Sequence, residues 1–164
     1  MLSGADAVVF EIVGLELCVQ AGAALDFETA SSLYVTVTVD DADFEGTPDD
    51  SVDLTIAVTD ENEAPTVAMA NVLADNSENA DTSAATKVAD IVVSDDALGT
   101  NALALSGVDA AFFEIVGSEL FLKAGSVLDF ETNATLDVAV EVDDAGVGGT
   151  PDDAAALALP GTDA

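Results

Sequence analysis

Oxygen-bearing side chains crowd into the segment Asp60-Glu61-Asn62-Glu63-Ala64-Pro65. It offers carboxylates, an amide and several backbone carbonyls, while Pro65 excludes a helix and biases Ala64 toward extended backbone. Calcium takes about six to eight oxygen ligands from groups of these kinds, so the composition suits calcium better than zinc or copper. An acidic, solvated linker has the same composition. The segment alone therefore leaves both alternatives open.

The charge balance excludes several classes of partner. The 164 residues include 33 aspartates and glutamates and two lysines, Lys87 and Lys123, with no histidine, which gives a formal net charge of −31. Nucleic acid and anionic membrane surfaces are therefore not expected as partners. Self-repulsion on this scale destabilises a compact state unless cations bind at defined sites or the surrounding salt is high.

Catalytic side chains are scarce as well. Without histidine the chain can form neither a Ser-His or Cys-His pair nor a histidine zinc site. Its single cysteine, Cys18, excludes an internal disulfide and is interpreted as a core residue. No apolar stretch is long enough to span a membrane, and no signal peptide is apparent. We expect no enzyme and no membrane insertion of this segment.

An internal repeat organises the chain. Leu2-Ser3-Gly4 returns as Leu105-Ser106-Gly107, and this offset, 105 − 2 = 103, holds without a gap to the end with identity above one half. Longer matches are Phe10-Glu11-Ile12-Val13-Gly14 with Phe113-Glu114-Ile115-Val116-Gly117, and Gly46-Thr47-Pro48-Asp49-Asp50 with Gly149-Thr150-Pro151-Asp152-Asp153. A period of this length indicates tandem globular domains and not a solenoid of short repeats.

The repeat also predicts the domain boundaries. Residues 66–104 precede the Leu-Ser-Gly motif of the second copy, whereas only Met1 precedes that of the first. We predict the C-terminal part of one module over residues 1–59, a linker at 60–65 and a nearly complete module over 66–164. The first module, lacking its opening third, should be the less stable half or should recruit strands from elsewhere.

Strand patterns dominate both copies. Valines at 35, 37 and 39, and at 138, 140 and 142, alternate with residues that differ between the copies, as expected of half-buried strands. Hairpins are predicted over residues 10–19 and 113–122, and further strands at 52–58, 66–72, 88–94 and 102–106. The segment 155–159 resembles a weaker, frayed strand before Pro160-Gly161. About seven strands in the second copy indicate an immunoglobulin-like sandwich. We predict that its core contains Val138, Val140, Val142, Leu120, Leu122, Phe113, Ile115 and Leu128.

Five motifs in order resemble the cadherin repeat of large bacterial surface proteins. Leu25-Asp26-Phe27-Glu28 and Leu128-Asp129-Phe130-Glu131 match its mid-domain Leu-Asp-x-Glu motif. The others are Glu78-Asn79, the segment Asp95 to Asn101, the acidic ends of the following strands at Asp41 and Asp144, and the linker itself. The resemblance implies an all-β fold of tandem, immunoglobulin-like, cadherin-type Greek-key β-sandwich modules, the first truncated at its N-terminus.

The resemblance also implies calcium (Ca²⁺) between modules. Its expected ligands at the junction are Asp26, Glu28, Asp60, Glu61, Asn62, Glu63, Asp95, Asp96, Asn101 and Asp144. Glu78, Asp129 and Glu131 would face the next junction downstream. Asp41 also begins an EF-hand-like segment, but Val52 stands at the twelfth position, where a bidentate glutamate is needed.

Two classes of function remain open. The first is a calcium-dependent adhesion or rigid spacer module of a bacterial surface or secreted protein, which places the chain outside the cell as a fragment of a larger protein. Its partners would be calcium and, beyond calcium, further copies of itself, surface proteins or polysaccharide. The alternative is a carbohydrate-binding β-sandwich, but the chain has no tryptophan and one tyrosine, Tyr34, whose counterpart is Asp137. A carboxylate-pair glycosidase lacks an aromatic cleft to hold a sugar.

Overall fold

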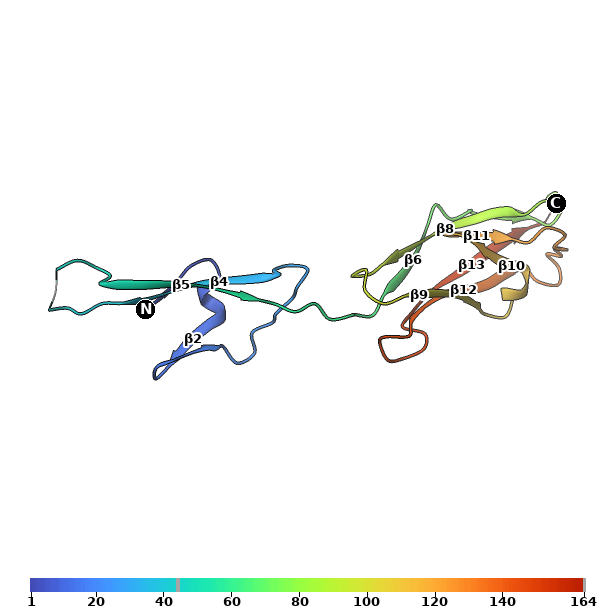
Figure 1. The fold of residues 1–164 in the computed structure, drawn as a ribbon. Coiled ribbons are helices and arrows are strands. Elements are labelled where there is room, and N and C mark those ends of the chain that lie inside the picture. The colour runs from blue at the N-terminus through green and yellow to red at the C-terminus, as the bar shows by residue number, and fades with distance from the viewer. Residues whose placement is uncertain (44, 164) are drawn as a thin grey trace. The chain divides into compact units, whose positions relative to one another are not determined.

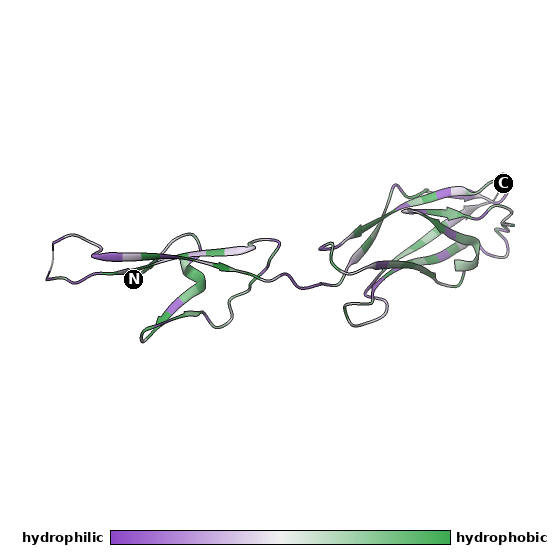
Figure 2. Ribbon diagram, in the orientation of Figure 1, coloured by the Kyte–Doolittle hydropathy of each residue, from purple (hydrophilic) through white to green (hydrophobic). Residues whose placement is uncertain are grey.

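The computed structural model describes residues 1–43 and 45–163. It divides into two compact units, Met1–Glu61 and Asn62–Ala164. Every helical element among the described residues is a three-residue 3-10 turn, and no described helix is long and apolar enough to cross a membrane. The remaining elements are strands, and hydrophobic residues concentrate on them in both units while hydrophilic ones gather in the connections (Figures 1 and 2). The prediction of an all-β fold is confirmed.

The second unit is a two-sheet sandwich (Figure 1). One sheet has the order β10-β11-β8-β6 and the other the order β7-β13-β12-β9. Their bounds are β6 (Thr66–Ala70), β7 (Asn76–Ser77), β8 (Thr86–Ser94), β9 (Asn101–Ser106), β10 (Phe113–Val116), β11 (Glu119–Leu122), β12 (Thr135–Asp144) and β13 (Asp153–Thr162), with the 3-10 turn η2 at Ala110–Phe112. All pairs are antiparallel except β13 with β7.

The core lies between these two sheets. The inward valines of β12 alternate with outward residues, as predicted, and Val140 and Val142 are 0% exposed. Of the eight predicted core residues six are buried, while Ile115 and Leu128 are partly buried and pack against the cluster. The cluster also contains Val67 of β6, Val88, Ala89 and Ile91 of β8, Leu136 of β12 and Leu159 of β13. Burial of side chains of this size contributes about 1.5–3 kcal/mol each to folding.

One strand prediction is wrong. The strand predicted to fray at Pro160-Gly161 is β13, which continues to Thr162. The cause is tertiary, because Gly161 and Thr162 pair in parallel with β7, a strand of two residues that the sequence pattern did not predict. The amide of Gly161 also donates a hydrogen bond to the carbonyl of Ala134 at 2.9 Å.

The first unit repeats the second half of the second unit, from β9 to β13, and has no elements before it. Its strands form one sheet of order β1-β4-β5 and one hairpin, β2-β3. Their bounds are β1 (Leu2–Ser3), β2 (Phe10–Val13), β3 (Glu16–Val19), β4 (Ser32–Val39) and β5 (Asp50–Ala57), with the 3-10 turn η1 at Ala7–Val9. Shifting these bounds by 103 residues, 105 − 2, places them on β9 to β13 and η2. No segment of the given sequence corresponds to β6, β7 or β8 in this copy.

The first unit consequently has a small core. Its buried cluster consists of Phe10, Leu33 and Val35. The predicted strand alternation is present, yet Val39 is 61% exposed whereas its counterpart Val142 is 0% exposed. Apolar side chains that β6 and β8 cover in the second unit therefore face solvent in the first.

Amide hydrogen exchange should report this difference. We expect amides of β4 to exchange at least about tenfold faster than their counterparts in β12, because a smaller apolar core lowers the free energy of local opening. The measurement is residue-resolved exchange on the monomeric chain. Equal protection of β4 and β12 would contradict the expectation.

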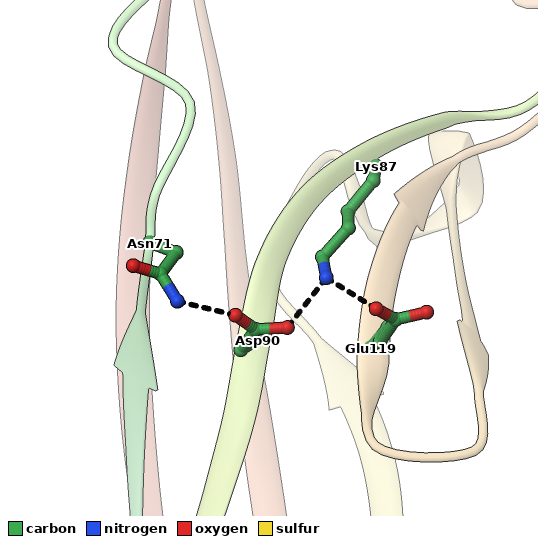
Figure 3. A network of polar contacts seen from close by, with 4 residues as sticks. All are labelled: Asn71, Lys87, Asp90 and Glu119. Atoms are coloured by element: carbon green, nitrogen blue, oxygen red, sulfur yellow. Dashed lines mark hydrogen bonds and ion pairs between the residues drawn. The ribbon is translucent and has the colours of Figure 1, made fainter.

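A network of ion pairs and a hydrogen bond joins β8 to β11 and to the residue that follows β6 (Figure 3). Lys87 Nζ pairs with Asp90 at 2.6 Å and with Glu119 of β11, and Asn71 Nδ2 donates a hydrogen bond to Asp90 Oδ2 at 2.6 Å. The hydrogen bond from Asn71 and then that from Lys87 lower the pKa of Asp90, and hydrogen bonds to Asp90 and Glu119 raise the pKa of Lys87.

The lowered pKa makes a prediction for acid conditions. Because the folded-state pKa of Asp90 lies below the ordinary value of 3.8, its ionised form stabilises the fold above that pH. The contribution is lost as pH falls through the lowered pKa. An NMR titration should show the pKa of Asp90 rising in Lys87→Met and unchanged in Lys123→Met, whose lysine donates to the carbonyl of Ala111 instead. An unchanged pKa in Lys87→Met would contradict the network.

Candidate metal centre

The loop between β8 and β9 is built around Asp96. The backbone amides of Glu63 and Leu98 donate to its two carboxylate oxygens at 3.0 and 2.8 Å, and these bonds lower its pKa. The neighbouring Asp95 accepts a hydrogen bond from Asn101 Nδ2 at 2.6 Å. Ala97, which follows Asp96, has a left-handed φ of 72°. Asp96 therefore ties the start of the second unit to this loop.

Asp144 is the most deeply buried of the predicted ligands. It is 1% exposed, at the end of β12 opposite Asn101 of β9. Its carboxylate oxygens accept from the amides of Thr100 at 3.0 Å and Gly146 at 2.7 Å. No lysine is among these donors, so the buried charge is held by backbone dipoles that leave lone pairs on both oxygens.

Two glycines make room for these groups. A Cβ atom at Gly99, whose φ is +67°, would lie 1.8 Å from Asp144 Oδ2. A Cβ atom at Gly146 would lie 2.9 Å from Asn62 Nδ2. The backbone thus approaches Asp144 and Asn62 more closely than any other residue type would allow.

Two buried oxygens of residues at this end of the second unit have no hydrogen-bond donor. They are Asn62 Oδ1 and Asp143 Oδ1. A buried acceptor left without a partner costs about 1–3 kcal/mol, and a bound cation would remove that cost. The donor set at this end of the second unit is made entirely of oxygens, which fits a hard divalent cation.

A second acidic group lies at the other end of β12, beyond Thr135. Glu78, Glu131 and Asp163 each place a carboxylate oxygen within 4.8 Å of the others. The amide of Phe130 donates to Glu78 Oε2 at 3.1 Å, which fixes this side chain against the Leu-Asp-x-Glu motif. Nearby, Asn76 Nδ2 of β7 is buried without an acceptor. Two carboxylates of this group, if both are ionised and about 5 Å apart, would repel each other by roughly 3 kcal/mol at an effective dielectric near 20. A bound cation would offset that repulsion.

The first unit repeats part of this group. The repeat offset, 105 − 2 = 103, carries Glu28 onto Glu131 and Asp60 onto Asp163. Oxygens of Glu28 and Asp60 again lie within 4.8 Å. The pKa of Glu28 is raised: its own backbone amide lowers it, but desolvation and the negative charge of Asp60 outweigh that effect. The same carboxylate pair therefore forms in both units.

The aspartates of the Leu-Asp-x-Glu motifs stabilise a turn. Asp26 accepts hydrogen bonds from the amide and hydroxyl of Thr29 at 3.0 and 2.8 Å, which lower its pKa. Asp129 accepts from the amide of Thr132 at 2.9 Å in the same way. Both carboxylates are exposed, so these hydrogen bonds leave further lone pairs open.

Within each unit the structure brings several predicted residues together. In the second unit Asn62, Glu63, Asp95, Asp96, Asn101 and Asp144 gather at one end, and Glu78 and Glu131 at the other. Glu28 and Asp60 meet in the first unit, and Glu61 is its exposed last residue. Two further acidic residues lie at these ends outside the predicted set. The repeat makes Asp163 the counterpart of Asp60, and the sequence leaves open which of the adjacent Asp143 and Asp144 coordinates.

No family model and no curated protein match the chain. Several solved structures are similar to it. Protocadherin gamma B2 extracellular cadherin domains 3–6 align with a TM-score of 0.69 and 21% identity over 94% of this chain and 36% of that one. A protocadherin gamma B7 EC3-6 cis-dimer structure aligns with a TM-score of 0.64 and 21% identity over 100% of this chain and 40% of that one. Human mucin-like protocadherin EC1-2 aligns with a TM-score of 0.60 and 22% identity over 95% of this chain and 79% of that one.

These comparisons concern the fold. The chain spans less than half the length of the two gamma protocadherin chains. At 21–22% identity they show the fold alone, a β-sandwich like that of cadherin domains, which confirms the predicted all-β sandwich fold.

Proposed function

We propose that the chain is a calcium-binding adhesion or spacer module of an extracellular protein, of the kind found in bacterial surface proteins. The observation that carries this proposal is that the oxygens of Asn62 and Asp143 are buried without a hydrogen-bond donor at the same end of the second unit as the buried carboxylate of Asp144. All three groups are ligands that calcium prefers. Neither lysine offers an alternative partner, since Lys87 pairs with Asp90 and Glu119, and Lys123 with a backbone carbonyl.

In this proposal residues 1–59 and 66–164 belong to two modules, and residues 60–65 link them. Calcium would be held at their junction by the predicted ligands of both modules and the linker, with Asp143 added to that set. Glu78, Asp129, Glu131 and Asp163 would contribute to a second junction. The net charge of −31 favours the same conclusion, because cations bound at defined sites offset self-repulsion.

Calcium is expected to bind and to stabilise the second unit. At a free concentration of about one hundred times Kd, binding to the folded state alone adds roughly 2.7 kcal/mol to the free energy of unfolding. Magnesium should substitute poorly because it demands a tight octahedral site and sheds water reluctantly. Calorimetric titration and thermal melts with calcium, magnesium and chelator measure both effects.

A matched pair of variants localises the binding. Asp143→Asn removes charge from the buried oxygen and should weaken calcium binding by about tenfold, since a carboxylate ligand is lost. Asp137→Asn makes the same chemical change at an exposed position of β12 and should leave binding unchanged. Absence of calcium heat and of any shift in melting, or equal binding by both variants, would contradict the proposal.

Small-angle scattering tests the spacer role separately. If calcium stiffens the junction, then the maximum dimension and its spread should change on addition of chelator. The double variant Asp60→Ala, Glu63→Ala should lose that response. Calcium heat without a scattering change would leave a calcium-binding module that does not act as a spacer.

A further inference from the structure

The sequence repeat contains one motif that the proposed calcium ligands do not include. It is Gly-Thr-Pro-Asp-Asp, identical at residues 46–50 and 149–153. In the second unit its carboxylates belong to Asp152 and Asp153, which lie at the same end of the sandwich as Asp144. Both lysines have other partners, and the hydrogen bonds that reach these two carboxylates come from backbone amides.

Asp152 holds the backbone of Asp144. Its Oδ2 accepts a hydrogen bond from the Asp144 amide at 2.6 Å, and its own amide donates to the carbonyl of Val142 at 3.0 Å. The carboxylate of Asp144 is held separately by the amides of Thr100 and Gly146. Asp152 therefore fixes the course of the backbone at Asp144, and the other two amides fix the position of its side chain.

The first unit contains the same contact. The amide of Asp41 donates a hydrogen bond to Asp49 Oδ2, and the amide of Asp49 donates to the carbonyl of Val39 at 3.0 Å. The repeat offset, 105 − 2 = 103, carries Asp41 onto Asp144 and Asp49 onto Asp152. Because the contact forms in both units, it belongs to the motif and not to the surroundings of one copy.

Asp153 holds a different segment. It is the first residue of β13, and its Oδ2 accepts a hydrogen bond from the amide of Val67 in β6 at 2.8 Å. β6 is the edge strand of the opposite sheet and begins directly after Pro65, which is buried. Asp153 therefore ties the strand that follows the linker segment 60–65 to the sheet that contains Asp144.

Two adjacent residues thus fix two segments that bear proposed ligands. One buried oxygen without a donor lies on each segment, Asp143 Oδ1 at the end of β12 and Asn62 Oδ1 in the linker segment. The segments meet, because a Cβ atom at Gly146 would lie 2.9 Å from Asn62 Nδ2. Ligands that are held in place before a cation arrives lose less conformational freedom on binding, which favours affinity.

We infer that Asp152 and Asp153 are positioning residues of the calcium site in the second unit, an inference that rests on the proposed function. Asp152 holds the backbone of Asp144, and Asp153 holds the start of β6, so that the end of β12 and the linker segment stay in place without a cation. Neither carboxylate is itself a ligand. Loss of either hydrogen bond loosens one ligand-bearing segment and weakens calcium binding.

Amide hydrogen exchange of the full chain in chelator tests the positioning without calcium. The amide of Asp144 should exchange at least about tenfold faster in Asp152→Ala than in the parent, and that of Val67 in Asp153→Ala, since each loses its acceptor. The amide of Asp137, which donates to Asp109 at 2.8 Å, should be unchanged in both variants. Unchanged exchange of the Asp144 and Val67 amides would overturn the inference and leave the proposed function intact.

A calcium titration followed by the amide signals of Thr100 and Gly146 measures the affinity of this end of the second unit. Asp152→Ala should bind calcium about tenfold more weakly than the parent. Asp152→Asn keeps an acceptor oxygen and loses only the charge, so its affinity should stay within about threefold of the parent, because a charge that does not touch the cation is screened by salt. Equal losses in the two variants would assign the effect to charge and overturn the inference.

Val88→Ala controls for stability. Val88 is 1% exposed near the start of β8, so its truncation should lower the melting temperature and leave the calcium affinity of the parent. If Asp152→Ala fails to fold, Asp153→Ala repeats the affinity test on the other segment. A parent chain whose amides do not respond to calcium would contradict the proposed function itself. Parent affinity in both alanine variants, or an equal loss in Val88→Ala, would overturn this inference alone.

Discussion

Replacement of Val140 with aspartate is expected to unfold the second unit. Val140 is 0% exposed and lies between Leu105 of β9 and Ala155 of β13, in the middle of its sheet. No donor is positioned to pair with a carboxylate there, and burial of an unpaired charge costs at least several kcal/mol. A domain of this size is stable by about 5–15 kcal/mol, so the loss removes most or all of that margin. Urea unfolding followed by circular dichroism and by amide signals of β12 measures it.

The repeat supplies a matched control for this variant. Val37 is the counterpart of Val140 on β4, but it is half-buried because no strands corresponding to β6 and β8 cover it. Val37→Asp should therefore cost the first unit clearly less, since the carboxylate can stay hydrated. A cooperative melt of the second unit in Val140→Asp, or equal losses in the two variants, would refute the core assignment.

Replacement of Gly99 with alanine is expected to have the second-largest effect. The left-handed φ of +67° alone costs an alanine about 1 kcal/mol. The added Cβ would also lie 1.8 Å from Asp144 Oδ2, so the carboxylate must move away from its amide donors. A buried charged group that loses a hydrogen bond costs about 1–3 kcal/mol more, which makes a total of roughly 2–4 kcal/mol. Calcium affinity should fall in parallel if Asp144 is a ligand.

Gly117→Ala separates the backbone strain of a left-handed φ from the contact between the added Cβ and the Asp144 carboxylate. Gly117 has a φ of +63° in the β10-β11 turn, and no atom lies within 4 Å of a Cβ built there. Its replacement should cost about 1 kcal/mol and leave calcium affinity unchanged. Equal destabilisation by both alanines would mean that the contact of Gly99 with Asp144 contributes nothing.

The sequence was sufficient for the local features of both units. Period-two valines predicted β4 and β12, and the Gly-x turns predicted both hairpins, because these patterns depend on backbone geometry within a few residues. The repeat predicted that both copies would form the same elements. The types of the proposed ligand residues also came from the sequence, since a preference for oxygen ligands can be judged without knowledge of spatial neighbours.

Only the tertiary structure decided which of those residues are buried. Val39 and Val142 have the same pattern around them, yet one is exposed and the other enclosed, because β6 and β8 cover the second unit alone. Likewise, Asp143 and Asp144 are adjacent and chemically identical. Their difference comes from amides of Thr100 and Gly146, which the fold brings to Asp144 and not to Asp143 Oδ1. Gly146 is local to Asp144, but Thr100 and the strands that bury Asp144 come from segments distant in the chain, and for that reason local sequence could not assign the burial.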